Sequence, residues 1–540
     1  MQEDGKFIKG AVIITIANII VKILGAVYRI PLRGILGKEG MGLFMAVYPI
    51  YSMMLSISTA GVPLAVSKLV SEKVALKNYT GARQVFRVSL MLMLASGLLF
   101  TGILMLAAPY YAEKVLKVPR TLYPLLAIAP AIAFYAVKSA LRGFFQGQQR
   151  MEPSALASIL EQIVRVGTIF LLAGIFVKRS LELGAAGAAF GAVTGAGAGL
   201  ILLIIFYFRL KPEYNRELSL SDQNILSPTK KVIKEIFALA LPVTIGSIIV
   251  PIVNMVDSTL ILPRLQAGGF SEDAALGMLG NLSGAAMALV NVPGILTIGL
   301  GTSLLPAVSK AYAQKQHTLI QKISSLAIRV SQIIAMPSAV GLFILAEPIS
   351  IFLFDISVAR SLSLAAFAAI FIILNQTTTP VLQGVGKTLL PVSHMFVGLL
   401  VKVTINYFLT PIPSINILGP AAGTIVAFAI ASYLNLRAIK RIIGSGVSVL
   451  ATFIKPALNS VLMGISIYFL YPLFDKMGGS LFGSETLAVG FAVFAAIGAG
   501  IVLYGLATIV TGTITRSEIE LIPGVGPRLA TILSHLKLLK

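Results

Sequence analysis

The sequence predicts an all-α integral membrane protein of about 14 transmembrane helices, arranged as two pseudo-symmetric six-helix lobes plus two extra helices. Composition and hydropathy indicate this class. Of the 540 residues, 57% are hydrophobic and only 12% are charged, whereas soluble domains carry about 25% charged residues. The mean hydropathy is +0.91, and apolar runs long enough to cross a bilayer recur along the whole chain.

These apolar runs place the expected helices in order. A helix of roughly 20 residues crosses a hydrocarbon core of about 30 Å, and the runs have about this length. We expect spans near residues 10–34, 41–66, 85–108, 122–143, 154–176, 184–208, 236–262, 279–308, 324–346, 361–383, 388–410, 419–436, 452–473 and 486–512.

The distribution of Lys and Arg predicts how these spans are oriented. With the N-terminus in the cytoplasm, most of the 43 Lys and Arg residues fall in loops on the cytoplasmic side, as the positive-inside rule requires. Lys138, Arg142 and Arg150 are counted among these cytoplasmic charges. The net charge of +22 is then a topology signal. We expect a multi-pass protein of the cytoplasmic membrane with both termini inside and no nucleic-acid partner.

A short internal repeat predicts the two lobes. PLAVSK (63–68) ends the second expected span and LPAVSK (305–310) ends the eighth, so AVSK recurs six spans apart. A repeat of this kind indicates two homologous halves. We expect a first lobe over 1–208, a charged cytoplasmic linker over 209–235, a second lobe over 236–441, two further helices over 442–512 and a cytoplasmic tail over 513–540.

The composition argues against an enzyme active site. The chain has no Cys, and its three His residues lie far apart in the sequence, so neither thiol chemistry nor a His- or Cys-based metal site is expected. The glycine-rich segment 384–388 lacks the first glycine of a P-loop. We therefore expect a transporter rather than an enzyme, with no cofactor, or at most a coupling cation such as sodium or a proton.

Cations inside the expected spans indicate a binding path for an anion. Lys22 and Arg29 lie seven residues apart in the first span, so on one helix they share a face, and Arg33 follows near the interface. A charged side chain near the bilayer centre costs roughly 3 kcal/mol, so it is retained where it meets a wet cavity, a partner or a ligand. We predict that Lys22, Arg29, Arg165 and Lys402 bind an anionic group of a ligand that passes these helices.

Two carboxylates and an amide are the other polar candidates. Glu161 precedes Arg165 by four residues, so the two can form an ion pair on one helix face. Alternatively, Glu161 pairs with a cation of the first span and leaves Arg165 for the ligand. Asp257 lies near Asn254 in a span that two prolines bend. We expect Glu161, Asp257 and Asn254 to bind a coupling cation or to pair with buried charges.

Several long segments resemble one known family. Together they resemble the stage V sporulation protein B group, in the polysaccharide-transporter branch of the MOP exporter superfamily, which also holds the MurJ-type lipid II flippases and the MATE drug exporters. The resemblance covers essentially the whole membrane region. The segments are KILGAVYRIPLRGILGKEGMGLF (22–44), AVSKLVSE (65–72), RTLYPLLAIAP (120–130), LRGFFQGQQRMEP (141–153) and LEQIVRV (160–166).

The resemblance implies a fold and an activity. It implies two six-helix lobes around a central cavity that works by alternating access. The implied cargo is an undecaprenyl-diphosphate-linked saccharide, such as lipid II or a related cell-wall or polysaccharide precursor. The resemblance then implies that its diphosphate is the anionic group that Lys22, Arg29, Arg165 and Lys402 bind. MurJ-type flippases use basic residues of their first helix, and Lys22 and Arg29 fall in the corresponding stretch. Their basic residue of helix eight has no counterpart in GAAMALVNVP (284–293), which leaves another lipid-linked glycan open.

Two other functions also stay open. A MATE-like, cation-coupled drug antiporter would need carboxylates for a cationic cargo, and Asp257 favours it. A non-transporting membrane scaffold for sporulation or wall assembly would not need deep charges in the first span. The expected partners are the lipid-linked saccharide and membrane lipids, and we expect the chain to act as a monomer.

Overall fold

The computed structural model describes residues 2–219, 226–444 and 447–513, and within these ranges it contains helices and no β-strand. The helices of the first half are α1 (Gln2–Val27), α2 (Arg29–Thr59), α3 (Val62–Ala75), α4 (Tyr79–Tyr110), η1 (Tyr111–Val115), η2 (Pro119–Thr121), α5 (Leu122–Ile128), α6 (Ala131–Gly147), α7 (Glu152–Phe176), α8 (Leu181–Ser219), α9 (Thr229–Ala267) and α10 (Glu272–Leu279). Those of the second half are η3 (Gly280–Ala286), α11 (Met287–Val290), α12 (Val292–Ala313), α13 (His317–Ile344), α14 (Ala346–Leu353), η4 (Ile356–Val358), α15 (Ala359–Ala365), α16 (Ala368–Gly384), α17 (Leu389–Leu409), α18 (Leu418–Ile443), η5 (Leu450–Ile454), α19 (Lys455–Leu481) and α20 (Glu485–Val510).

Many of these helices can cross a membrane. In the part of the chain that the structure describes, 11 helices are long and apolar enough, or 12 if the bent pair Ile356–Ala365 and Ala368–Gly384 forms one span. The expected spans 10–34 and 41–66 fall outside this set and are covered by α1, α2 and α3. The all-α, multi-pass fold is therefore confirmed, whereas the count of fourteen is not.

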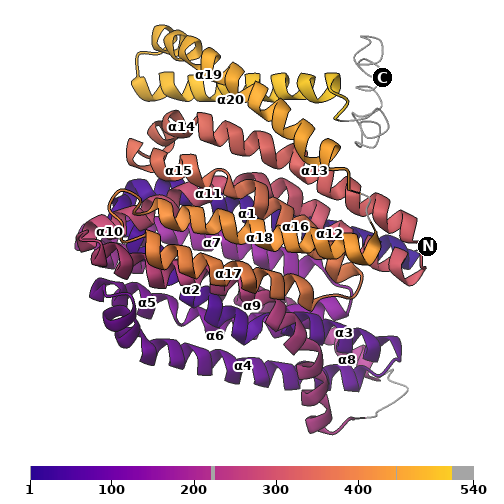
Figure 1. Cartoon of the computed structure of the whole chain (residues 1–540). Coiled ribbons are helices and arrows are strands. Elements are labelled where there is room, and N and C mark those ends of the chain that lie inside the picture. Colours follow the sequence, from indigo (N-terminus) through magenta and orange to yellow (C-terminus); the bar gives the residue numbers. More distant parts are fainter. Residues whose placement is uncertain (1, 220–225, 445–446, 514–540) are drawn as a thin grey trace. The chain divides into compact units, whose positions relative to one another are not determined.

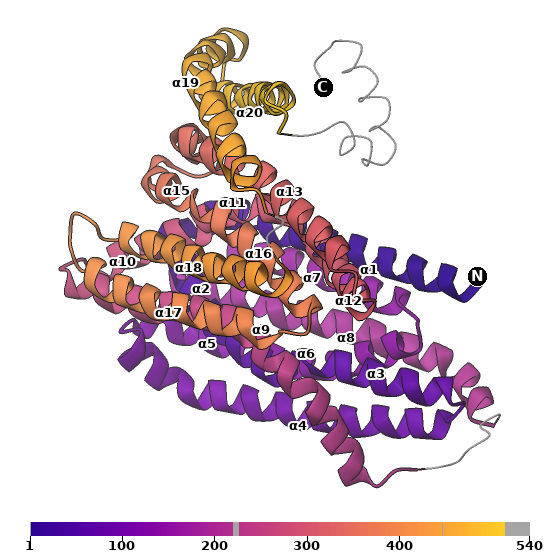
Figure 2. The same ribbon diagram turned by 45° about the vertical axis from the view of Figure 1, so that its right-hand side comes forward.

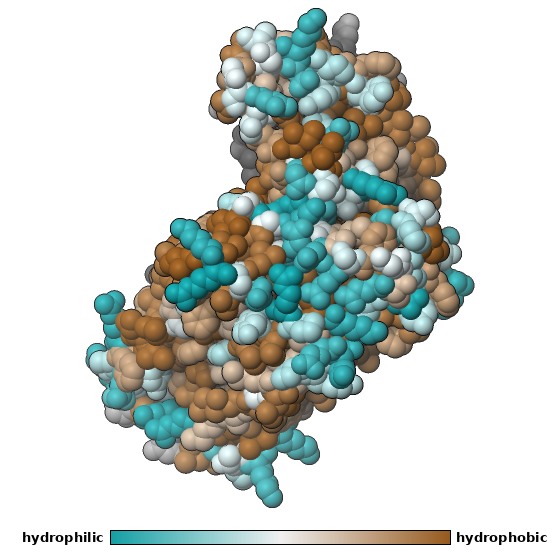
Figure 3. Space-filling model, turned by 90° about the vertical axis from the view of Figure 1, so that its left-hand side faces the viewer, coloured by the Kyte–Doolittle hydropathy of each residue, from teal (hydrophilic) through white to brown (hydrophobic). Residues whose placement is uncertain are grey.

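The surface of the helices is apolar, as contact with lipid requires. Large side chains such as Leu106, Phe469 and Phe494 are more than half exposed. Figure 3 shows broad apolar areas on the face that it presents, interrupted by polar groups. Helices satisfy their own backbone hydrogen bonds, so such a surface is stable in hydrocarbon.

Two breaks interrupt the first helices. α1 ends at Val27 and α2 begins at Arg29, because Pro31 has no N–H to donate to the Val27 carbonyl. Gly37 adopts φ 68° and ψ −177° inside α2, a conformation that glycine reaches without strain. Lys22 therefore lies on α1 and Arg29 on α2. Tyr28 between them keeps α-helical φ and ψ, and its N–H donates to the Leu24 carbonyl while its carbonyl accepts from the Leu32 N–H, so the shared face of the two cations stays a prediction.

Contacts divide the chain into two compact units. The first comprises Met1–Gly284 and Asn406–Ile417, and the second comprises Ala285–Ile405 and Leu418–Lys540. In the expected linker at 209–235, α8 continues to Ser219 and α9 begins at Thr229. The lobe boundaries stay a prediction, and the expected tail lies outside the described residues from residue 514 onward.

Neighbouring helices of each unit pack side by side. In the first unit α6 packs against both α3 and α4, and in the second α19 runs beside α20. Figures 1 and 2 show both arrangements from two directions.

The same local contact occurs at the two AVSK segments. In the first unit, a Cβ atom at Gly143 of α6 would lie 2.8 Å from the Val66 Cβ atom; in the second, a Cβ at Gly384 of α16 would lie 2.8 Å from the Val308 Cβ. Val66 and Val308 occupy the same position of the repeated tetrapeptide. Each half thus packs the valine of the repeated tetrapeptide against a glycine, which supports the repeat.

Glycines at every fourth position of α8 bring it close to α7. Gly187, Gly191, Gly195 and Gly199 share one helix face. A Cβ atom at Gly195 would lie 2.7 Å from the Cβ atom of the α7 residue at position 165 and 2.8 Å from the carbonyl oxygen at position 161. Small residues at this spacing allow membrane helices to approach closely. The contact fixes the rotation of α7, which carries two of the predicted site residues.

Candidate functional site

Five polar side chains from three helices meet inside the first unit. They come from α2, α6 and α7, which pack on one another. Three of them are ionisable groups that are 3%, 8% and 9% exposed, so the site is largely closed by protein. We call this set the Glu161 cluster; its members are Tyr48, Tyr135, Lys138, Glu161 and Arg165.

Two side chains of α6 bind the Glu161 carboxylate. Its carboxylate accepts hydrogen bonds from the Lys138 ammonium and from the Tyr135 hydroxyl. The Lys138 Nζ atom also lies 3.9 Å from the centre of the Tyr135 ring. The prediction that Glu161 pairs with Arg165 on its own helix is wrong, and so is the alternative of a partner on the first span. Lys138 was expected among the cytoplasmic charges and is buried instead, because it faces the Glu161 carboxylate.

Arg165 faces α2. Its Nη2 atom donates a hydrogen bond of 3.1 Å to the Tyr48 hydroxyl, and its guanidinium carbon lies 5.6 Å from the centre of the Tyr48 ring. Its Nε atom is buried and has no hydrogen-bond acceptor among the described residues. Arg29 has a buried Nε in the same situation, and it lies within electrostatic range of the Tyr48 hydroxyl.

The charges of this site do not cancel. Arg29, Lys138 and Arg165 are cations, and Glu161 is the carboxylate that opposes them. Arg142, one turn after Lys138 on α6, interacts electrostatically with Lys138 and adds to the excess. A buried donor without an acceptor costs about 1–3 kcal/mol, and more when it is charged. The arrangement therefore favours an anion with several oxygen acceptors, such as a phosphate or diphosphate group.

Lys22 borders the cluster. It is exposed on α1, which packs against α7. Three residues later, a Cβ atom at Gly25 would lie 3.5 Å from the Gln162 Nε2 atom of α7. The structure therefore places Lys22 beside the helix that carries Glu161 and Arg165, but outside their hydrogen-bond network. Arg33, expected at the interface, is 4% exposed.

Asp257 has a partner of its own. The Asn406 Nδ2 atom donates a hydrogen bond of 2.9 Å to the Asp257 Oδ1 atom, and Asn406 is fully buried. Asn254 is exposed on α9. Lys402 is 1% exposed, one turn before Asn406 on α17. No group of three or more His, Cys, Asp or Glu in the described ranges is placed to hold a metal ion, and the coupling role of these residues stays a prediction.

Three members of the cluster, Tyr48, Tyr135 and Lys138, were not predicted as site residues. Lys138 carried a signal, because it lies inside the expected span 122–143 and follows Tyr135 by three residues, which places both on one helix face. Tyr48 carried no comparable signal. The packing of α2 on α7 alone brings it to Arg165.

The described helices define a multi-pass, all-α membrane protein. An inward-facing structure of a multidrug resistance MATE family transporter of the MOP superfamily has the same fold, with a TM-score of 0.65 at 16% identity over 80% of this chain and 95% of that one. An inward closed structure of the lipid II flippase MurJ gives a TM-score of 0.62 at 16% identity, over 93% and 98% of the two chains.

The chain belongs to the polysaccharide biosynthesis protein family, whose model matches residues 7–312. The MatE family model matches residues 242–408, so the predicted membership of the MOP superfamily is confirmed. Stage V sporulation protein B of Bacillus subtilis (strain 168) is 29% identical, over 81% of this chain and 84% of that protein. Lipid II flippase MurJ of the same organism is 28% identical, over 93% and 95% of the two chains.

Proposed function

We propose that the chain is a flippase that moves an undecaprenyl-diphosphate-linked saccharide, lipid II or a related cell-wall precursor, across the cytoplasmic membrane. The observation that carries the proposal is the excess of positive charge in the Glu161 cluster, with the buried Nε donors of Arg29 and Arg165. The names of the relatives, stage V sporulation protein B and lipid II flippase MurJ, support it.

The chemistry of a lipid diphosphate suits this cluster. A hydrogen bond between charged groups contributes about 1.5–3 kcal/mol, and a guanidinium can donate two bonds to one phosphate. Glu161 keeps Lys138 compensated while the site is without substrate, so the cluster is stable before binding. The polyprenyl tail gains about 0.8 kcal/mol for each CH₂ group that stays in lipid, so the protein has to shield only the head group.

A MATE-like antiporter is the second candidate. The MatE match over residues 242–408 and the Asp257–Asn406 contact within that region favour it. The Glu161 cluster opposes it, because like charges would repel a cationic cargo. A cation-driven efflux of cationic dyes from proteoliposomes, lost in Asp257→Asn, would favour this candidate over the flippase.

The flippase proposal is tested in proteoliposomes that hold the purified chain and a fluorescent undecaprenyl-diphosphate-linked saccharide. Quenching from outside reports which leaflet holds the lipid. We expect Arg29→Ala and Arg165→Ala to slow translocation at least about tenfold, since each loses a charged contact of about 1.5–3 kcal/mol. Lys114 is an exposed cation of η1. Lys114→Ala is therefore the matched control and should translocate at the wild-type rate.

Translocation by both Arg variants at the wild-type rate would contradict the proposal. A second set of vesicles with the monophosphate carrier tests the anion: the diphosphate carrier should be moved faster, because it offers more acceptor oxygens. Comparing lipid II with other saccharides on the same carrier then identifies the glycan.

A further inference from the structure

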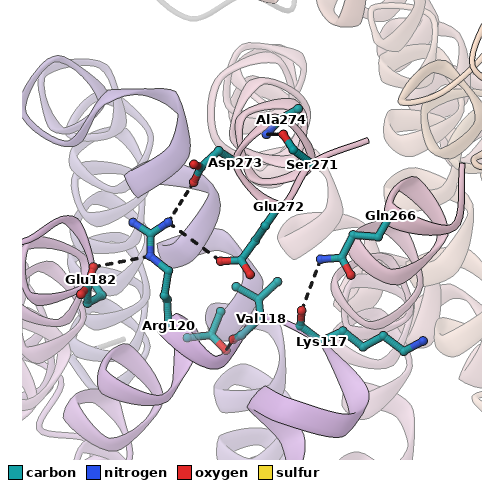
Figure 4. A network of polar contacts seen from close by, with 10 residues as sticks. Lys117, Val118, Arg120, Glu182, Gln266, Ser271, Glu272, Asp273 and Ala274 are labelled. Carbon is teal, nitrogen blue, oxygen red and sulfur yellow. Dashed lines mark hydrogen bonds and ion pairs between the residues drawn. The ribbon is translucent and has the colours of Figure 1, made fainter. Parts of the chain in front are cut away.

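A polar network joins segments that lie far apart in the sequence (Figure 4). The Arg120 Nε atom of η2 lies 3.5 Å from the Glu182 Oε2 atom at the start of α8. The Arg120 Nη1 atom lies 2.8 Å from the Asp273 Oδ1 atom and 3.9 Å from the Glu272 Oε1 atom, both at the start of α10. Arg120 and Glu182 belong to the expected first lobe, and Glu272 and Asp273 to the expected second lobe.

A close backbone contact accompanies this network. On α2, a Cβ atom at Gly42 would lie 2.1 Å from the Leu276 carbonyl oxygen of α10, and a Cβ at Gly280 would lie 2.2 Å from the Lys38 carbonyl oxygen. Any side chain larger than hydrogen at either position would force the two segments apart. We call the Arg120 network and the Gly42–Leu276 and Gly280–Lys38 contacts, all within the first unit, the Arg120 seam.

We infer that the Arg120 seam is a conformational latch. It holds α10 against η2, α8 and α2 in the state described here, and it opens when these segments separate during transport. The inference rests on the proposed function, because a flippase must expose its site to one leaflet and then to the other, and these two states have to exchange.

The strength of the seam suits a contact that is made and broken in each cycle. The four side chains of the network are between 26% and 67% exposed, and an exposed ion pair changes an equilibrium constant only by about two- to fivefold. The glycine contacts at Gly42 and Gly280 bring backbone against backbone. Both parts can therefore separate without unfolding a helix.

The charges of the network also predict whether removal of Arg120 opens or closes the seam. Arg120 faces three carboxylates, so the network is neutralised only in part. Without the guanidinium, Glu182 of α8 would face Glu272 and Asp273 of α10 with nothing between the like charges. Removal of Arg120 therefore replaces attraction across the seam by repulsion, and it should favour the open state.

The test measures the width of the seam in the full chain. Because the chain has no Cys, Lys178→Cys and Ala267→Cys, two exposed positions outside the network, can carry spin labels for distance measurement in nanodiscs. We expect Arg120→Ala and Gly42→Val to raise the ratio of long to short distances, by roughly tenfold for Arg120→Ala if its three ion pairs each contribute about twofold. Lys114→Ala should leave the ratio unchanged.

Two further measurements separate a latch from a merely destabilised protein. The swap Arg120→Asp with Asp273→Arg should recover part of the short-distance population. Raising the salt concentration from 0.1 to 1 M should widen the wild-type seam, since salt screens exposed ion pairs. Distance distributions that stay at the wild-type ratio in Arg120→Ala, Gly42→Val and high salt would overturn the latch.

Translocation of the labelled lipid is measured on the same samples. If distances respond as expected but the wild-type chain moves no lipid, the flippase proposal fails and the latch stands. If lipid moves and the distances do not respond, the latch alone fails.

Discussion

Glu161 controls the charge balance of the cationic cluster. It is the carboxylate that compensates Lys138, and both are almost fully buried. A buried ion pair contributes little net stability compared with apolar side chains, but the loss of one partner leaves an uncompensated charge in the interior. Removal of Glu161 should therefore lower the stability of the protein most when Lys138 is still present.

The difference between an intact buried ion pair and a single unpaired charge predicts the result of a double-mutant cycle at Glu161 and Lys138. We expect Glu161→Leu to lower the free energy of unfolding by about 3–5 kcal/mol, because it leaves Lys138 buried and unpaired. The double variant Glu161→Leu with Lys138→Met should recover most of that loss. Denaturant unfolding in detergent, followed by circular dichroism, measures both. A loss in the double variant equal to the sum of the losses in Glu161→Leu and Lys138→Met alone would show that the pair is not coupled.

At the scale of single elements, the glycine face of α8 decides where α7 places its charges. Gly195 lies against the backbone at Glu161 and Arg165. A side chain at this position cannot be accommodated by a rotamer change, because the nearest atoms include a carbonyl oxygen of α7. It would move the whole helix and both site residues with it.

We therefore expect Gly195→Leu to lower the free energy of unfolding by about 1–3 kcal/mol, the range of overpacked cores, and to slow lipid translocation. Gly197→Leu is the matched control on the same helix, because a Cβ atom there would meet no atom within 4 Å. Thermal unfolding and the vesicle assay measure the two effects. A larger loss in Gly197→Leu than in Gly195→Leu would contradict the proposed helix contact.

At the scale of the whole molecule, charge distribution predicts the orientation in the membrane. Lys114 is expected outside and Lys387 inside, and both are exposed in the structure. Because the chain has no Cys, Lys114→Cys and Lys387→Cys each create a single thiol. In intact cells a membrane-impermeant maleimide should label the first variant and spare the second until the cells are opened.

Labelling of both positions in intact cells, or of Lys387→Cys alone, would contradict the predicted topology.

The lobe boundaries are tested at the same scale by the repeated AVSK contact. Gly143→Val and Gly384→Val should destabilise the protein to a similar degree, since each meets an equivalent valine.

Much of the candidate site could be predicted from the sequence. Arg29, Glu161 and Arg165 are charged residues within apolar runs, and the cost of burying them marks them as candidates without any structure. Their partners could not be assigned from the sequence. The four-residue spacing of Glu161 and Arg165 on α7 would allow an ion pair between them, but each binds a residue of another helix instead. Tyr48, on a distant helix, had no signal in its own segment.

The sequence by itself determined that the chain is a multi-pass helical membrane protein. The length of each apolar run and the positive charge of each loop are local properties of the sequence, and they determine which segments span the bilayer and in which orientation. It also identified the charged residues that lie within membrane spans and are therefore candidates for the site. Only the tertiary structure decided that Glu161 pairs with Lys138, that Arg165 turns to Tyr48, and that Arg120 joins α8 to α10. These pairings depend on how distant helices are rotated and packed, and that rotation is set by close contacts such as those of Gly195 and Gly42.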